Sequence, residues 1–179
     1  MSHTVESSGI NDDDLTPSTT AGYKLGQERS LAELAALDQE DESLQKWKAS
    51  LGLNTGAVGQ AGPKRSPDEI AKLKKNPINI KEGIEYSVGI EFTVENQIVS
   101  GLKYLQLVKR SGIKVDKTEK MIGSHGPQAE PYSRIIAEEE SPSGMLARSG
   151  TYNVRSRIVD DDGVVYVDFE WAFKLTTSW

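Results

Sequence analysis

Few side chains in this sequence have the type and spacing that enzymes use, and the histidines show this first. The chain has two, His3 near its start and His125 in the stretch G-S-H-G-P. A metal site normally needs several converging His, Cys or carboxylate ligands, and neither histidine has such a set beside it. We therefore expect His125 to lie on the surface and predict no metal site. Because no nucleophile and base can be assembled either, we predict that the chain is not an enzyme.

Two other polar stretches favour turns over catalytic sites. Residues 123–126, G-S-H-G, match neither the phosphate-binding loop nor the dinucleotide fingerprint, and they lack the strand-to-helix context of both. Residues 160–163, D-D-D-G, lack the ligand spacing of a calcium loop, whereas Asp-Gly between two alternating segments is typical of a β-hairpin. A solvated turn is the simpler interpretation of D-D-D-G, and contact with a basic partner is the alternative.

A third acidic stretch, D-Q-E-D-E-S at residues 38–43, lies between two segments with helical spacing. Leucines at steps of three residues and a capping-box spacing predict a helix over 31–38. Apolar residues at steps of three and four predict a second helix over 42–51, which Asp41 or Ser43 would cap. Capping is the structural interpretation of the acidic stretch. The two helices suggest a hairpin with too little surface for a core of its own.

The composition on either side of these helices favours flexible chain. Residues 1–29 are rich in Ser, Thr, Gly and Asp and have few apolar anchors, so we expect them to be disordered. Residues 52–63 are rich in glycine and almost uncharged, as flexible linkers are. We therefore predict that residues 1–65 form an arm. Ser66 and Pro67 have the types of a helix N-cap and first helical residue, and they predict a helix at the start of the folded domain.

From residue 78 onward the apolar period changes from that of a helix to that of a strand. Even positions from 84 to 94 are apolar or aromatic and the odd ones mostly polar, which predicts a half-buried strand. Further strands are predicted over 98–110 (with a bulge at Gly101), 113–115, 132–136, 152–158 and 165–175. Such strands, separated by turn residues, predict an all-β fold, an antiparallel immunoglobulin-like β-sandwich over residues 66–179.

Composition excludes several classes of protein. The 179 residues carry a formal net charge of -6, which argues against binding to nucleic acid. There is no cysteine, so disulfides and thiolate metal sites are excluded. No signal peptide is recognisable, and no run approaches the roughly 20 apolar residues that cross a bilayer. We expect a cytoplasmic protein without stable membrane insertion.

A series of longer motifs follows one order along the chain: L-D-Q-E-D-E-S-L-Q-K-W-K-A-S-L-G, I-K-E-G-I-E-Y, I-V-S-G-L-K-Y-L-Q, V-D-K-T-E-K-M-I-G-S-H-G-P, G-M-L-A-R-S-G-T-Y, S-R-I-V-D-D-D-G and F-E-W-A-F-K-L. From about Ser30 to Trp179 these motifs closely resemble the Rho GDP-dissociation inhibitor family, and fungal members most of all. The resemblance implies a non-enzymatic, monomeric regulator without a cofactor. Such a protein binds prenylated (geranylgeranylated) Rho-type GTPases in the GDP form, slows GDP release and keeps the complex off membranes.

The resemblance also assigns residues. The prenyl tail is expected between the two sheets, against Ile78, Tyr86, Ile98, Leu146, Val154, Phe169 and Trp171. The arm is expected on the GTPase switch regions through Asp38, Asp41, Ser43, Leu44 and Trp47, with the Asp41 carboxylate bonded to a switch I threonine. Asp161 and Asp162 align with the sandwich's own contact to the GTPase.

One part of the family pattern is missing. The family places two further strands between the glycine-rich tether, residues 52–63 in this chain, and the K-E-G motif. This chain lacks about two dozen residues there, enough for two strands of ordinary length. Their loss predicts an exposed sheet edge and a partly open pocket. The alternative function is therefore a truncated non-inhibitory isoform, or a general chaperone for prenyl tails.

Overall fold

The computed structural model describes residues 12–18, 22, 36, 40–50, 66–95 and 97–179. The helix predicted over 31–38 lies outside these residues except for position 36, and the tether over 52–63 lies outside them entirely. The helix predicted over 42–51 is confirmed as α2, Glu42–Ser50.

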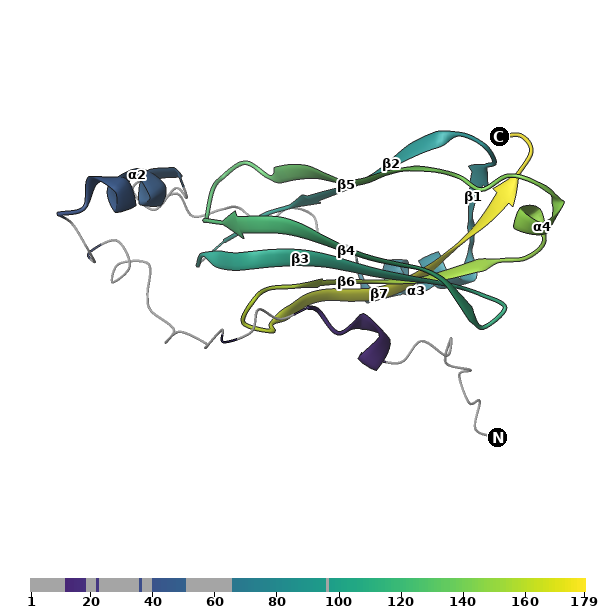
Figure 1. Cartoon of the computed structure of the whole chain (residues 1–179), viewed down its shortest axis with the longest axis horizontal. Coiled ribbons are helices and arrows are strands. Elements are labelled where there is room, and N and C mark those ends of the chain that lie inside the picture. The colour runs from purple at the N-terminus through teal and green to yellow at the C-terminus, as the bar shows by residue number, and fades with distance from the viewer. Residues whose placement is uncertain (1–11, 19–21, 23–35, 37–39, 51–65, 96) are drawn as a thin grey trace.

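Two β-sheets face each other and confirm the predicted all-β sandwich (Figure 1). One sheet has two strands, β2 (Glu85–Phe92) and β5 (Tyr132–Glu140). The other has five, in the order β1 (Ile78–Lys81), β7 (Val165–Thr176), β6 (Tyr152–Val159), β3 (Val99–Arg110) and β4 (Ile113–His125). The smaller sheet therefore covers only part of the inner face of the larger one.

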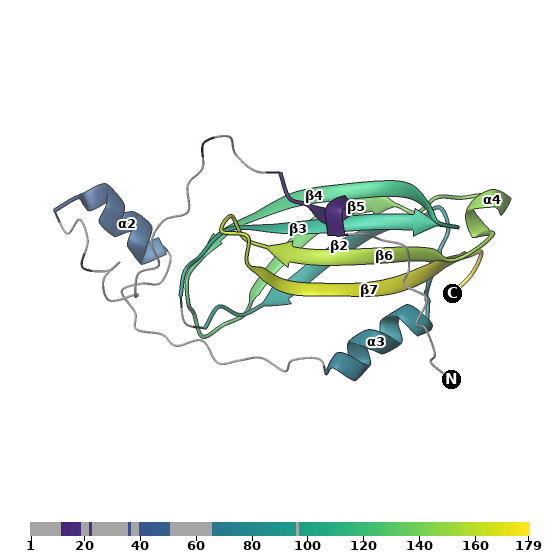
Figure 2. The ribbon, with the colours of Figure 1, turned by 90° about the horizontal axis from the view of Figure 1, so that it is seen from below.

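The predicted helix at the start of the folded domain is confirmed as α3, Pro67–Lys75. Ser66 and Glu69 form a reciprocal capping box, in which each side chain accepts a bond from the other residue's backbone N–H, at 3.3 and 2.9 Å. The helix lies beside β7, the strand that contacts it most, and Lys74 forms an ion pair with Glu170 of that strand (Figure 2). A short fourth helix, α4 (Met145–Arg148), precedes β6.

The prediction of a purely antiparallel sheet is wrong for one pair of strands. β4, β3, β6 and β7 are antiparallel neighbours, but β1 runs parallel to β7, with Ile78 opposite Phe173. β1 can be parallel because the rest of the sandwich separates it from β7 in sequence, so that no hairpin joins the two. Alternation of apolar residues reports which face a side chain occupies and does not report strand direction.

The strand predicted over 113–115 is much longer in the structure, because β4 continues to His125. The prediction that 123–126 form a turn is therefore wrong for its first three residues. The prediction that His125 is exposed is also wrong, since only 6% of the residue is accessible to solvent. Its ring packs against those of Phe92 and Tyr132, at centroid distances of 5.2 and 4.5 Å, and those two rings also stack on each other. The histidine closes one end of the core.

This burial predicts a pH dependence of folding. Burial lowers the pKa of His125, the charge of Arg134 acts in the same direction, and a bond to the Ile122 carbonyl only partly offsets them. Above pH 7 the imidazole ring is neutral in both the folded and the unfolded chain. Below the unfolded-state pKa of about 6.5, the unfolded chain binds a proton at His125 more readily than the folded chain does. Stability is thus expected to fall as the pH drops from 7.5 to 5.5.

The variant His125→Phe keeps an aromatic ring in place and removes the titrating group. Urea unfolding at pH 7.5 and 5.5 should show a smaller loss of stability for this variant than for the original chain. Carboxylates titrate in both proteins, so the difference between the two losses is the informative quantity. Equal losses in the two proteins would show that His125 is not the group responsible.

The bulge predicted at Gly101 is confirmed. The register of β3 against β4 shifts between Val99 and Leu102. Gly101 has a φ of +61°, in the left-handed region where glycine is favoured. A β-carbon added at Gly101 would overlap the carboxylate of Asp161. The glycine therefore lets the D-D-D-G turn approach β3 closely.

We expect Gly101→Ala to lower the free energy of unfolding by about 2 kcal/mol or more, from backbone strain together with steric overlap. Gly112→Ala is the matched control, because Gly112 also has a positive φ of +80° but open space around its α-carbon. That control should cost about 1–2 kcal/mol from strain alone. Urea unfolding measures both, and an equal cost for the two would argue against the overlap at Asp161.

Residues 1–29 were expected to be disordered, and this expectation is wrong for residues 12–18. The 3₁₀ helix η1 (Asp12–Leu15) lies on the five-stranded sheet, and Leu15 is fully buried. Leu15 is the buried apolar residue that anchors this polar segment to the sheet, which the composition of residues 1–29 did not predict.

Candidate functional site

The inner face of β6 and β7 brings together three of the residues assigned to the prenyl tail. Val154 lies directly opposite Trp171 in the register of the two strands, and Phe169 lies opposite Ser156. Val154 is buried with 1% of its surface exposed, whereas Phe169 and Trp171 are half-buried. Trp171 packs against a buried cluster made of Val108, Tyr152, Val154, Phe173 and Leu175. These side chains form a continuous apolar surface between the sheets.

A buried polar network lies next to this surface, and the sequence did not reveal it. The Tyr104 hydroxyl donates to Oε1 of Gln106 at 2.6 Å and is 2.9 Å from the Ser156 hydroxyl. The indole N–H of Trp171 donates to the same Ser156 oxygen at 3.1 Å. Burial raises the pKa of Tyr104, so the phenol stays neutral. The network satisfies the polar atoms of this face and fixes the orientation of the Trp171 ring.

The other four assigned residues are spread along the sandwich. Tyr86 of β2 is half-buried and donates its hydroxyl to Glu139 of β5 at 2.7 Å. Ile98 is half-buried just before β3. Ile78 of β1 is 47% exposed and Leu146 of α4 is 81% exposed. Only Val154, Phe169 and Trp171 therefore share one strand pair.

Burial along β7 falls toward the hairpin that precedes it. Phe173 and Leu175 are buried, Phe169 and Trp171 are half-buried, and Val167 is 38% exposed. Val167 faces inward because it lies opposite Ile158, which packs against a buried cluster with β2 and β5 side chains. An inward-facing residue with this exposure lacks full cover from the two-stranded sheet.

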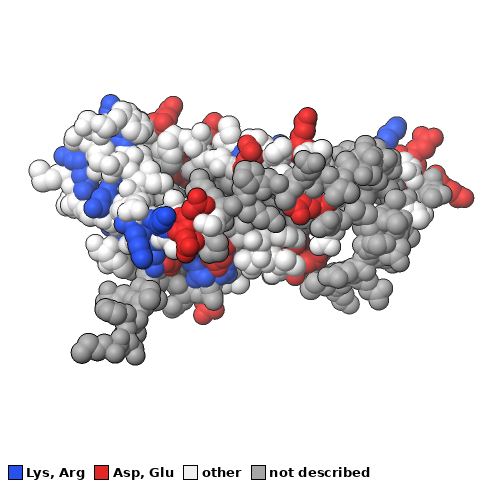
Figure 3. Space-filling model, turned by 180° about the vertical axis from the view of Figure 1, so that it is seen from behind, with Lys and Arg blue, Asp and Glu red and all other residues white. Residues whose placement is uncertain are grey.

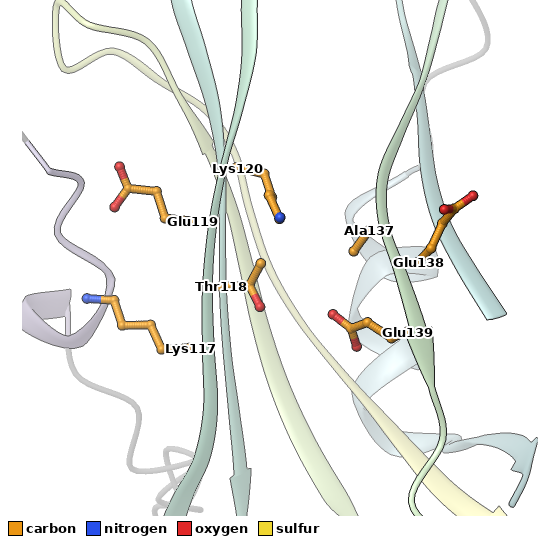
Figure 4. A pocket seen from close by; sticks show the side chains of 7 residues that line it. All are labelled: Lys117, Thr118, Glu119, Lys120, Ala137, Glu138 and Glu139. Atoms are coloured by element: carbon orange, nitrogen blue, oxygen red, sulfur yellow. The ribbon is translucent and has the colours of Figure 1, made fainter. Parts of the chain in front are cut away.

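A cavity of about 390 Å³ opens between the edge strands β4 and β5, but its lining is polar. In Figure 4, Thr118 and Lys120 point from β4 toward β5, and Glu139 points back toward them. Water or a polar group suits this lining better than a hydrocarbon tail does. The cavity is thus distinct from the apolar face of β6 and β7.

The arm residues assigned to the GTPase lie on or beside α2, apart from Asp38, which is outside the described residues. The Oδ1 atom of Asp41 accepts the backbone N–H groups of Ser43 at 2.8 Å and Leu44 at 3.2 Å. Asp41 is therefore the N-cap of α2, as its position predicted. Leu44 is half-buried, and Trp47 is 51% exposed, a large apolar area for one short helix.

The D-D-D-G stretch forms the predicted hairpin turn, and its three carboxylates differ in their surroundings. Asp160 is 5% exposed and accepts bonds from the Val164 backbone and the Tyr166 hydroxyl, both at 2.8 Å. Asp161 pairs with Lys103 at 2.9 Å. Asp162 is exposed. Asp161, which is assigned to the GTPase contact, thus has a partner within the sandwich.

Among the described residues, no three His, Cys, Asp or Glu side chains lie close enough to hold a metal ion. Within the same residues, no helix is long and apolar enough to cross a membrane. Acidic and basic side chains lie next to one another on the face drawn in Figure 3 instead of forming one large area of a single charge.

Comparison with known proteins identifies the family. A family model described as "RHO protein GDP dissociation inhibitor" matches residues 8–71 and 63–178, which together span most of the chain. The chain belongs to the Rho GDP-dissociation inhibitor family. It is 40% identical over 177 residues to a Rho GDP-dissociation inhibitor of Schizosaccharomyces pombe, with 87% of this chain and 86% of that protein covered. It is 37% identical over 180 residues to the human Rho GDP-dissociation inhibitor 1, with 89% and 88% covered.

The same comparisons locate a gap relative to the family. The family model matches in two pieces that meet at residues 63–71. The alignment with the S. pombe protein has 177 positions but covers 87% of 179 residues, which is about 156, so about 20 positions have no residue in this chain. The two pieces overlap at the start of α3, within the stretch between the arm and β1 where the sequence predicts that two strands are missing.

Proposed function

We propose that this chain binds geranylgeranylated, GDP-bound Rho-type GTPases, slows GDP release and keeps the complex soluble in the cytoplasm, acting as a monomer without a cofactor. Family membership supports the regulatory role, since the relatives are named as GDP-dissociation inhibitors. The observation that carries the lipid part is the inner face of β6 and β7, where Val154, Phe169 and Trp171 present an apolar surface that is only partly covered.

The physical argument for a lipid site rests on exposed apolar area. A prenyl tail in water costs about 25 cal/mol per Å² of apolar surface, so a protein that removes it from a bilayer must offer a comparable apolar surface. A face of buried valine and half-buried aromatic rings supports such a site. The bond that the Trp171 indole N–H donates to Ser156 holds the ring in place before the tail arrives, which reduces the entropy lost on binding.

The arm supplies the second part of the proposed function. Asp41 begins α2 and Trp47 projects from it, so a carboxylate and an aromatic side chain are presented on one helix. A helix of nine residues gains most of its stability from contact with a partner. We expect α2 to bind the switch regions, and by holding them still to slow the escape of GDP.

Release of a fluorescent GDP analogue from a geranylgeranylated, GDP-loaded Rho GTPase tests the proposal. Saturating amounts of the chain should slow release several-fold or more. The unprenylated GTPase is the control, because it lacks the lipid contact and should need a much higher concentration of the chain. Unchanged release from the prenylated protein at saturation would rule out the inhibitory function.

A second candidate is a chaperone for prenyl tails that does not inhibit nucleotide release. The exposure of Val167 on the inner face and the gap of about 20 alignment positions before β1 favour it, because both indicate an incomplete second sheet. This candidate predicts tight binding of a geranylgeranylated peptide together with unchanged GDP release. The same release assay therefore separates the two candidates.

A further inference from the structure

The outer face of the five-stranded sheet carries a segment of the chain itself. Leu15 of η1 forms a cluster with Leu105 and Leu107 of β3 and Val159 of β6, and these side chains are 0–2% exposed. Figure 2 shows η1 lying across this sheet, and β3 is the strand that it contacts most. Side chains alternate along β3, so Leu105 and Leu107 face away from Tyr104 and Gln106 of the inner face.

Two leucines on an outer sheet face require an explanation. An antiparallel sheet with one solvated side normally carries polar residues there. Leu105 and Leu107 nevertheless have no exposed surface, and Leu15 is the residue of η1 that packs against them. The sheet thus has an apolar spot that residues 12–18 cover.

Polar contacts surround this apolar spot and come from three strands. Lys109 of β3 pairs with Asp14 at 3.1 Å, and Lys103 donates to the Ser18 carbonyl at 2.9 Å. Arg157 of β6 donates to the Leu15 carbonyl at 3.4 Å. Its guanidinium is in turn held by Asp168 of β7, at 2.7 and 2.9 Å.

Glu119 of β4 completes the set. Both of its carboxylate oxygens lie 3.2 Å from the backbone N–H of Ser18, and its Oε1 also accepts the Ser18 hydroxyl. The carbonyl groups and the carboxylate of residues 12–18 therefore contact lysine and arginine side chains. The backbone N–H and hydroxyl of Ser18 contact the carboxylate of Glu119. This complementarity in sign over three strands is typical of a built binding site.

We propose that the outer face of β3, β4 and β6 is a binding site for the chain's own residues 12–18, an acidic segment with one leucine. Docking fixes the arm at a second point, since its other end continues into α3 on the sandwich. Residues between Ser18 and Ser66, which include α2, then form a closed loop. A loop held at both ends keeps α2 at a higher effective concentration near the sandwich than a chain held at one end does.

The docking itself does not depend on the proposed function, and only its consequence for GTPase binding does. The chain contains no cysteine, so a pair of introduced cysteines reports docking without background. Ser18→Cys with Glu119→Cys places a thiol on each side of an existing contact. Under mild oxidation the full-length chain should form an intramolecular disulfide, seen as a monomer of increased gel mobility. No GTPase is present in this experiment.

Leu15→Asp, added to the cysteine pair, should slow disulfide formation about tenfold or more, because it would bury a carboxylate among leucines. Asp13→Ala is the matched control, since Asp13 is exposed and, within the described residues, its bond is the one that its backbone carbonyl accepts from Thr16. It should leave the rate unchanged. Ser18→Cys paired with Ser87→Cys, on the exposed side of β2, should remain reduced.

Equal rates with and without Leu15→Asp would overturn the proposal, as would equal rates for the Glu119 and Ser87 pairs. Circular dichroism and thermal unfolding show whether the sandwich of the Leu15→Asp variant remains folded. If it does not, Asp14→Ala is the second variant, because it removes the pair with Lys109 without placing a charge among the leucines, and it should slow disulfide formation to a smaller extent.

Discussion

Replacing Asp41 with alanine is expected to raise the concentration of the chain needed to inhibit GDP release by about 10- to 100-fold. A hydrogen bond to a charged group contributes about 1.5–3 kcal/mol, which corresponds to that range. The loss of the N-cap of α2 also costs about 1 kcal/mol of helix stability, which moves the expected change toward the upper end of that range. Release of a fluorescent GDP analogue from the prenylated GTPase, titrated with each variant, measures the change.

Asp41→Ser separates the two effects. Serine is as good an N-cap as aspartate, but it lacks the carboxylate that we assign to the switch I contact. Inhibition by this variant should be nearly as weak as that by Asp41→Ala. Binding of a geranylgeranylated peptide, which does not involve the arm, should be unchanged in both variants. Full inhibition by Asp41→Ser would reduce the role of Asp41 to helix capping.

The features that could be predicted from sequence are those set by local chemistry. Ser66 followed by Pro67 predicts a helix N-cap, and the cap forms, with Glu69 adding the second bond of a capping box. Asp-Gly between two strands predicts a hairpin, and residues 160–163 make one. Alternation of apolar side chains located β2 and β7 because a half-buried strand must place such residues on one face.

The features that could not be predicted depend on what lies across from a residue in space. The direction of β1 follows from its pairing with β7, a strand about 90 residues away. His125 is buried because the rings of Phe92 and Tyr132 pack against it, and Phe92 belongs to β2, a strand far from His125 in sequence. Leu15 finds its cover on β3 and β6 in the same way. A residue's own type and spacing contain none of these contacts.

The candidate site shows the same division. Parity along β7 places Phe169 and Trp171 on one face, and the register with β6 adds Val154. Parity along β3 and β6 also points Gln106 and Ser156 to that face, but only the structure shows that Ser156 accepts a bond from Trp171. The sequence therefore contained one signal for the buried polar network, namely that Gln106 and Ser156 are polar residues at inward-facing positions of their strands.

Trp171→Ala is expected to weaken binding of a geranylgeranylated C-terminal peptide by about 30-fold or more. An aromatic side chain of this size can bury 150–250 Å², and if half of that area contacts the tail, its loss is worth about 2–3 kcal/mol. Trp179→Ala is the control, because Trp179 is 83% exposed at the end of the chain and should not affect the affinity. Fluorescence anisotropy of a labelled peptide gives the dissociation constants.

Trp171→Phe distinguishes a lipid contact from a purely structural role. Phenylalanine keeps most of the apolar area but loses the bond to Ser156, so affinity should fall less than in Trp171→Ala, by about two- to tenfold. Urea unfolding of each variant shows how much of the change comes from stability, since the truncation also leaves Ser156 with one partner fewer. In each variant, the loss of peptide affinity is compared with the loss of free energy of unfolding. If the two losses are proportional in both variants, with no additional loss of affinity for Trp171→Ala, the ring supports the sandwich and does not contact the lipid. An additional loss confined to Trp171→Ala is the outcome expected if the ring lies against the tail, because it depends on apolar area and not on the hydrogen bond.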